Sequence, residues 1–205
     1  MESIASSVRS ALSSLSDRAF LHARRVPGPT GAVEAELSRL ARRGEIRRVR
    51  KGLYWKGPKT RLGIAAPAPQ DVALEVAGPG AGPAGIEAAR WLGLTTQVAG
   101  RPEIAVPGRV PAPVAGVRFC SRSPRRREFG LTPIEVAVIE VLRDWPVSVE
   151  ADWDELRDKV IHLVAAGEIR PDRIAGQVAE EHHLALRERW AELVPAVIPA
   201  LVVQS

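Results

Sequence analysis

Arginine side chains dominate the stretch SRLARRGEIRRVRKGLYWKG, residues 38–57 of the chain. A guanidinium presents its N–H donors in a planar fork that matches the O6 and N7 edge of guanine or the oxygens of a phosphate. The chemistry that such a stretch offers is recognition of a polyanion, without bond making. All its basic residues except Lys56 form two runs, which are Arg39, Arg42 and Arg43, then Arg47, Arg48, Arg50 and Lys51.

A second chemistry is suggested by the carboxylates Asp152, Asp154, Glu155 and Asp158. Carboxylates can hold Mg²⁺, and a metal-dependent nuclease would also bind DNA. Such sites usually collect ligands from separate strands, whereas these four lie within two helical turns, and acidic residues favour a helix N-terminus for electrostatic reasons alone. The adjacent His182 and His183 diverge on a helix and are poor metal ligands. We therefore expect no enzymatic activity, no metal and no cofactor.

Two further motifs are expected to carry no chemistry. A literal G-x-G-x-x-G occurs at Gly80, Gly82 and Gly85, but prolines interrupt it and no βαβ pattern surrounds it, as a dinucleotide site requires. We expect a flexible loop there. The single cysteine, Cys120, excludes an internal disulfide, suits a reducing cytoplasm and is expected to pack as a small hydrophobe.

Charge is unevenly distributed along the 205 residues, whose formal net charge is +5. Residues 1–60 hold 13 basic and 5 acidic residues (net +8), residues 61–130 hold 9 and 5 (net +4), and residues 131–205 hold 7 and 14 (net −7). The N-terminal part is therefore expected to meet a polyanion. No apolar run approaches the roughly 20 residues that span a bilayer, and the N-terminus lacks a signal-peptide pattern, so we expect a cytoplasmic protein with no membrane partner.

The elements that would position the arginines are predicted from hydrophobic spacing. A first helix is predicted over residues 3–15, followed by a short helical segment over 20–26 and a PGPTG turn. A second helix is predicted from Thr30, as its N-cap, to Arg43. Its inner face comprises Val33, Leu37, Leu40 and Ala41. Its opposite face comprises small residues first and arginines after them, namely Ala32, Ala35, Arg39 and Arg42.

Two short strands, EIRRVR and LYW, are predicted to form a hairpin that turns at Lys51-Gly52. Ile46, Val49 and Leu53 would pack inward and leave the arginines outside. Helix, helix, turn, helix and two-stranded ribbon is the order of a winged helix-turn-helix. The plainer alternative is an ordinary helix and hairpin with a solvated charged face. The predicted DNA-binding residues are Thr30, Ala32, Ala35, Arg39, Arg42, Arg43, Arg47, Arg48, Arg50 and Lys51.

The rest of the chain is predicted to form an α/β segment over 61–130 and a helical bundle over 131–205. The run KGPKTRLGIAAPAP, residues 56–69, is predicted to be a proline-rich connector. Short helices are predicted at 70–78 and 86–94, strands at 101–108 and 115–123, and four helices at 132–145, 152–167, 172–180 and 183–193. Prolines 195 and 199 should stop a regular helix, so the apolar tail LVPAVIPALVVQS either closes its own core or docks on another chain. A possible second basic patch, extending the DNA footprint, holding a partner or protecting an edge strand, comprises Arg118, Arg122, Arg125, Arg126 and Arg127.

The run LSRLARRGEIRRVRKGLY, residues 37–54, closely resembles the N-terminal winged-helix signature of AbiEi-like antitoxins, the antitoxin half of type IV toxin–antitoxin systems. GPAGIEAARWLGLTTQVAGRPEIAVPG resembles the family's next segment, and FCSRSPRRRE with LTPIEVAVIEVLRD resembles the arginine-rich strand and acidic helix after it. The resemblance covers roughly residues 10–145 well and the last sixty weakly.

This resemblance implies a protein that represses its own operon through operator DNA and neutralises a co-encoded nucleotidyltransferase-type toxin. It places DNA reading on the helix and wing arginines named above, with Tyr54 bracing the second wing strand. The predicted fold is α+β and mainly helical, with a winged helix-turn-helix over 1–60 and an interaction domain over 61–205; a homodimer is possible. The alternative function is a free-standing winged-helix transcriptional regulator whose second domain senses a ligand or oligomerises.

Overall fold

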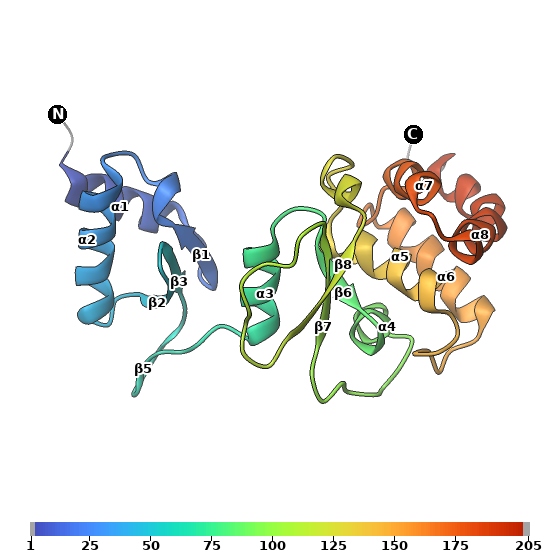
Figure 1. Cartoon of the computed structure of the whole chain (residues 1–205), viewed down its shortest axis with the longest axis horizontal. Coiled ribbons are helices and arrows are strands. Elements are labelled where there is room, and N and C mark those ends of the chain that lie inside the picture. The colour runs from blue at the N-terminus through green and yellow to red at the C-terminus, as the bar shows by residue number, and fades with distance from the viewer. Residues whose placement is uncertain (1–2, 203–205) are drawn as a thin grey trace. The chain divides into compact units, whose positions relative to one another are not determined.

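The computed structural model describes residues 3–202, and side chains up to residue 197. The fold is α+β and mainly helical, as predicted. The chain divides after Val72 into two compact units (Figure 1).

The first unit has the last helix and the hairpin of the predicted winged helix-turn-helix, but a strand and one 3₁₀ turn replace its second helix. Its three-stranded antiparallel sheet has the strand order β1-β3-β2, so the N-terminal strand pairs with the second strand of the wing. The elements are α1 (Ile4–Ser14), β1 (Ala19–His22), the 3₁₀ turn η1 (Ala23–Arg25), α2 (Thr30–Arg42), β2 (Arg47–Arg50) and β3 (Leu53–Lys56).

The helical segment predicted over residues 20–26 is wrong in its first half. Ala19–His22 is a strand, and only one 3₁₀ turn follows. The reason is tertiary: Phe20 and Leu21 pair with Trp55 and Tyr54, and the rings of Phe20 and Trp55 lie 4.6 Å apart. A pairing partner more than thirty residues away leaves no trace in the local periodicity on which the prediction depended.

The first unit is built on one apolar cluster between α1, α2 and the sheet. The predicted inner face of α2 is confirmed, because Val33, Leu37 and Leu40 are buried and Ala41 packs partly buried against the cluster. The predicted N-cap is wrong, since Pro29 occupies that position and Thr30 is the first helical residue, with no side-chain cap.

A second, smaller hairpin follows the wing where a proline-rich connector was expected. Its strands are β4 (Lys59–Thr60) and β5 (Gly63–Ile64). Arg47 Nη1 donates to the Ile64 carbonyl at 3.1 Å, and Trp55 Nε1 donates to the Ala65 carbonyl at 3.0 Å. These bonds attach the hairpin to the wing, which is why the first unit extends past the expected boundary at residue 60.

The second unit combines a three-stranded sheet with helices. The sheet order is β6-β7-β8, with β6 antiparallel and β8 parallel to β7. Its elements are α3 (Pro69–Ala77, which crosses the boundary), β6 (Gly82–Ala84), α4 (Ile86–Leu92), β7 (Glu103–Pro107), β8 (Arg118–Arg122), the 3₁₀ turn η2 (Pro124–Arg127), α5 (Pro133–Asp144), α6 (Trp153–Ala165), α7 (Pro171–Glu180) and α8 (Leu184–Val202).

The glycine-rich segment expected to be a flexible loop is a buried strand. All three residues of β6 are buried, and a Cβ on Gly82 would lie 2.4 Å from Val136 Cβ. Gly80 has φ +79°, and a Cβ there would lie 2.6 Å from the Arg126 carbonyl oxygen. Gly80 and Gly82 therefore allow close backbone packing.

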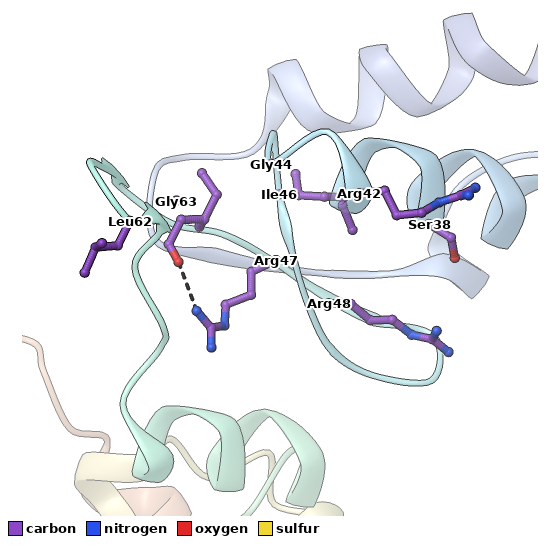
Figure 2. A pocket seen from close by; sticks show the side chains of 10 residues that line it. Ser38, Arg42, Gly44, Ile46, Arg47, Arg48, Leu62 and Gly63 are labelled. Atoms are coloured by element: carbon purple, nitrogen blue, oxygen red, sulfur yellow. Dashed lines mark hydrogen bonds between the residues drawn. The ribbon is translucent and has the colours of Figure 1, made fainter.

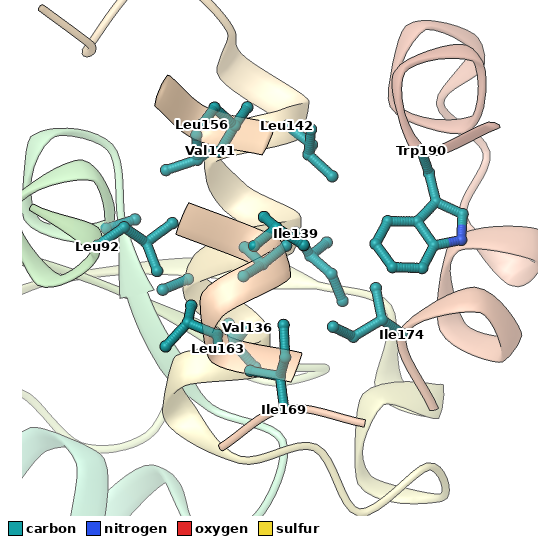
Figure 3. Packing of buried hydrophobic residues seen from close by; sticks show 14 of the residues in the cluster. Leu92, Val136, Ile139, Val141, Leu142, Leu156, Leu163, Ile169, Ile174 and Trp190 are labelled. Carbon is teal, nitrogen blue, oxygen red and sulfur yellow. The ribbon is translucent and has the colours of Figure 1, made fainter. Parts of the chain in front are cut away.

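Helix α5 is the centre of the second unit and joins its sheet to its other helices. Residues 135–142 of α5 are all buried, and Figure 3 shows Val136, Ile139 and Leu142 surrounded by side chains of α4, α6, α7 and α8. Both α5 and α6 begin with a full capping box, on Thr132 and Asp152. The predicted α/β segment over 61–130 and the predicted helices over 131–205 therefore share one core.

Helix α8 continues through Pro195 and Pro199, where a stop was predicted. Leu193 and Val197 are buried in the same core as Leu186 and Trp190, and this packing offsets the missing backbone donors. The described part of the apolar tail therefore closes its own core. The side chains of residues 198–205 lie outside the part described.

Candidate nucleic-acid interface

The exposed face of α2 changes character along its length. Gly31, Ala32 and Ala35 are exposed in its first turns, and a Cβ on Gly31 would meet open space. Arg39 and Arg42 are exposed on the same face further along. A helix face with small side chains at one end and cationic side chains at the other leaves room for a bulky polyanion close to the start of the helix. Thr30 is exposed at this end, at the uncapped first turn.

The helix arginines differ in their partners. Arg39 forms an ion pair with Glu36, whose side chain is only 8% exposed, and Arg43 Nε lies 2.7 Å from Glu45 Oε1. Among the described residues Arg42 has no ion-pair partner. The guanidinium of Arg42 is therefore available to a ligand, whereas that of Arg39 is paired with Glu36 of the same helix.

The wing presents further cations beside α2. Arg48, Arg50 and Lys51 are exposed and, within residues 3–197, form no ion pair. Arg47 is also exposed, but one of its guanidinium nitrogens is bound to the β4–β5 hairpin. The wing turns at Gly52, with φ +71°, which favours glycine. Ile46 and Leu53 are buried as predicted, while Val49 is half-buried.

A partly buried hydrogen bond connects α2 with β3. The Tyr54 hydroxyl lies 3.1 Å from Ser38 Oγ, and the Tyr54 side chain is almost fully buried. Tyr54 therefore does more than the resemblance implied, because it joins β3 to α2 as well as filling the core under the wing. The sequence offered no signal for Ser38 as its partner.

A concave surface lies where α2, β2 and the β4–β5 hairpin meet. Its volume is about 550 Å³, and Figure 2 shows Arg47 between the hairpin and the side chains of Arg42 and Arg48. Its lining includes no acidic residue and comprises Ser38, Ala41, Arg42, Gly44, Ile46, Arg47, Arg48, Leu62, Gly63 and Ile64. We call this surface the cationic pocket. The sequence did not predict the contribution of Leu62 to Ile64, because strands of two residues show no periodicity.

The possible second basic patch is not a free cationic surface, so that expectation is corrected. Arg126 is fully buried, with Nη1 2.7 Å from Glu140 Oε1 and Nη2 2.8 Å from Glu181 Oε1, and its Nε donates a hydrogen bond to Glu181 Oε1 at 2.9 Å. Arg122 Nη2 lies 2.8 Å from the same Glu140 carboxylate. Burial raises the pKa of Glu140, but the guanidiniums of Arg126 and Arg122 outweigh it and hold that pKa below its ordinary value.

The remaining arginines of the predicted patch are mostly paired as well. Arg118 forms an ion pair with Glu103, and Arg125 Nη1 lies 2.8 Å from Glu180 Oε2. Arg127 is exposed and has no ion pair within the described residues. Spacing in the sequence placed these arginines together, but the fold uses most of them to hold η2 and β8 to nearby acidic side chains.

In the acidic cluster considered for a nuclease, Asp152 and Glu155 cap the N-terminus of α6. Asp152 and Glu155 bond to each other's backbone N–H groups, each at 2.9 Å, and Arg157 pairs with Asp154 at 2.7 Å and with Asp158 at 3.7 Å. Among the described residues, no group of three or more His, Cys, Asp or Glu side chains is arranged to hold a metal ion. In the same part of the chain, no helix has the length and apolar character needed to cross a membrane.

Cys120 behaves as a small apolar residue. It is partly buried against the core of the second unit, and burial raises the pKa of its thiol.

Comparisons with known proteins add little to this geometry. No family model and no curated protein matches the chain. The crystal structure of the Rv2827c protein from Mycobacterium tuberculosis is similar, with 17% sequence identity and a TM-score of 0.45 over 96% of this chain and 78% of that one. A similarity at this level carries no argument about function.

Proposed function

We propose that the protein binds duplex DNA through its first unit, with α2 in the major groove and the β2–β3 wing on the sugar-phosphate backbone. The observation that carries this proposal is the exposed face of α2, which has small side chains in its first turns and arginines further along. Cations without an ion pair in the described residues continue this surface on the wing. A major groove admits one α-helix, and small residues let it enter deeply.

The cations divide into two roles. Arg42, and Arg39 once it leaves Glu36, can donate two hydrogen bonds to a guanine edge. Arg48, Arg50 and Lys51 supply phosphate contacts, which release counterions and contribute affinity without sequence preference.

We further propose that the protein acts as an antitoxin, repressing its own operon and neutralising a co-encoded nucleotidyltransferase-type toxin in the cytoplasm. This part rests on the resemblance of residues 37–54 to the AbiEi-like signature. It makes the first unit the repressor and the second unit the partner-binding module. Operator DNA and the toxin would be its partners, and a homodimer would suit a palindromic operator.

Two experiments test these proposals separately. Footprinting on DNA upstream of the chain's own reading frame should show a protected site that non-specific DNA does not compete for at equal concentration. Inducing the adjacent reading frame alone should arrest growth, and co-expression of this protein should restore it. A harmless neighbour would contradict the antitoxin role and leave the DNA-binding proposal standing.

A free-standing winged-helix regulator is the second candidate function. It is favoured by a cavity of about 540 Å³ in the second unit, lined by Ser121, Arg122, Ser123, Pro124, Arg125, Arg143, Glu180, Glu181 and His182. A small ligand bound there would contact η2 and β8. In that case operator affinity should change when a metabolite is added, and the adjacent reading frame should be harmless.

A further inference from the structure

The β4–β5 hairpin presents an unusual tip for a soluble protein. Leu62 is 101% exposed, the highest value among the exposed large apolar side chains described, and it sits next to Arg61 in the two-residue turn between Thr60 and Gly63. A single exposed leucine is common and by itself means nothing. Leu62 differs from such a residue because its turn is hydrogen-bonded, its hairpin is attached to the wing and basic side chains lie around it.

The tip is held rigidly by its own turn. Thr60 Oγ1 accepts a hydrogen bond from the Leu62 amide at 3.2 Å and donates one to the Gly63 carbonyl at 2.7 Å. Gly63 has φ +101°, a conformation that favours glycine and closes the turn. The backbone of the turn is therefore pre-organised, and little backbone entropy remains to be lost when Leu62 inserts into a partner.

The base of the hairpin is attached to the wing. Arg47 Nη1 and Trp55 Nε1 donate to the carbonyls of Ile64 and Ala65, and the Ala65 amide donates to Pro58 at 2.9 Å. Ile64 is almost fully buried. These contacts determine the place of Leu62 relative to α2, so a duplex bound to the helix would meet the hairpin at a defined position.

Cations surround the leucine and indicate the chemistry of what it meets. Lys59 and Arg61 lie in the hairpin itself, and Leu62 shares the cationic pocket with Arg42, Arg47 and Arg48. A protein partner with an apolar socket would need an acidic rim to tolerate this field, whereas a nucleic acid supplies phosphates on both sides of an apolar base stack.

We propose that the β4–β5 hairpin is a second wing that inserts Leu62 between two base pairs in the minor groove beside the major groove read by α2. The cationic pocket would then hold the sugar-phosphate strand that separates the two grooves. Lys59 and Arg61 would contact the phosphates on either side of the insertion. Apolar wedges of this kind partly unstack one base step and kink the duplex by about 20–90°. The inference rests on the proposed DNA binding and specifies its mode.

The test uses the full chain and the DNA fragment immediately upstream of its own reading frame. The fragment is labelled at both ends, so that energy transfer reports the kink. It also carries 2-aminopurine at successive steps of the protected site, so that fluorescence reports local unstacking. The wild-type protein should kink the duplex and raise 2-aminopurine fluorescence at one step beside the α2 contacts. Leu62→Ala should keep the footprint, abolish both signals and lose about tenfold in affinity, the value expected for one buried leucine side chain. Leu62→Met, which keeps an apolar wedge, should retain both signals.

The controls separate the possible failures. Leu62 is fully exposed, so its replacement leaves the fold intact, and Val147→Ala removes another exposed apolar side chain (86%) and should change nothing. Wild-type protein that binds without kinking, or Leu62→Ala that kinks normally, would overturn the second wing and leave DNA binding standing. Loss of binding to the neighbouring gene's product by Leu62→Ala, with normal kinking, would make the tip a protein contact. Wild-type protein that binds no duplex would overturn both proposals.

Discussion

At the scale of single residues, the two kinds of cation on the first unit should behave differently. Arg39→Ala and Arg42→Ala should each weaken cognate DNA binding by about 1–3 kcal/mol if they read bases, with a smaller effect on random DNA. Arg48→Ala should weaken cognate and random DNA alike, because a phosphate contact carries no sequence information. Fluorescence anisotropy on both duplexes measures the difference. Equal losses for all three variants on both duplexes would contradict base reading by α2.

The Glu36–Arg39 pair provides an internal check on that prediction. If Arg39 must leave Glu36 to reach a base, Glu36→Gln should raise affinity for cognate DNA more than for random DNA. An equal gain on both duplexes would indicate a change in net charge alone.

The Tyr54–Ser38 hydrogen bond should stabilise the first unit modestly. Tyr54→Phe removes the hydroxyl without changing the shape of the buried ring, and it should lower the free energy of unfolding by about 0.5–1.5 kcal/mol. Ser38→Ala should cost a similar amount, and the double variant should cost less than the sum of the two. Urea titrations of the three variants and the wild type measure the coupling. Full additivity would show that the bond contributes nothing.

Glu140 should make the second unit sensitive to acid. The pKa of the Glu140 carboxyl in the folded protein lies below its unfolded value of about 4.5. The ionised carboxylate therefore stabilises the folded state fully above about pH 4.5, and this contribution is lost as the pH falls through the folded pKa. The free energy of unfolding should therefore decrease as the pH falls below 4.5. Glu140→Gln should flatten this dependence and cost about 3 kcal/mol at pH 7, because Arg126 is left buried without its full counter-charge.

A matched control for Glu140 is available on α8. Glu188 is exposed, so Glu188→Gln should change neither the stability at pH 7 nor its dependence on acid. If Glu140→Gln behaves like Glu188→Gln, the buried ion pairs do not stabilise the unit.

At the scale of elements, the contact between β6 and α5 should tolerate no side chain at Gly82. A Cβ there would lie 2.4 Å from Val136 Cβ, so either the strand or the helix must move. Gly82→Ala should destabilise the protein by about 1–3 kcal/mol in thermal or urea unfolding. Gly100→Ala is the control, because a Cβ on Gly100 would meet nothing within 4 Å. Equal stability of the two variants would refute the close approach of β6 and α5.

Elements also differ in how far the local sequence determined them. Helices α2, α5, α6 and α7 follow their predicted spans closely, because each has a clear apolar stripe and recognisable boundaries, such as Gly44 after α2 and the capping boxes of α5 and α6. Strands β1 and β6 were missed. Each exists because of a partner distant in sequence, Leu53–Lys56 for β1 and Glu103–Ala105 for β6.

At the scale of the whole molecule, the charge of the first unit should make binding strongly dependent on salt. Arg48, Arg50 and Lys51 have no ion pair in the described part of the chain and are assigned to phosphates, and the second wing adds Lys59 and Arg61. Five such contacts predict that log Kobs falls against log salt with a slope of about −4 to −5. Arg48→Gln with Arg50→Gln should reduce the slope by about two. A slope near zero for the wild type would contradict an interface made of phosphate contacts.

The sequence by itself determined the charge division, the amphipathic helices and the basic wing, because these depend on residue type and short-range spacing. Only the tertiary structure decided which cations are free. It buried Arg126 between Glu140 and Glu181, because an ion pair between residues distant in sequence depends on the fold that brings them together. The pairing of Arg39 with Glu36, by contrast, is local to α2. The tertiary structure also determines that the predicted connector forms a hairpin with Leu62 at its tip. The side chains that attach this hairpin, Arg47 and Trp55, belong to β2 and β3.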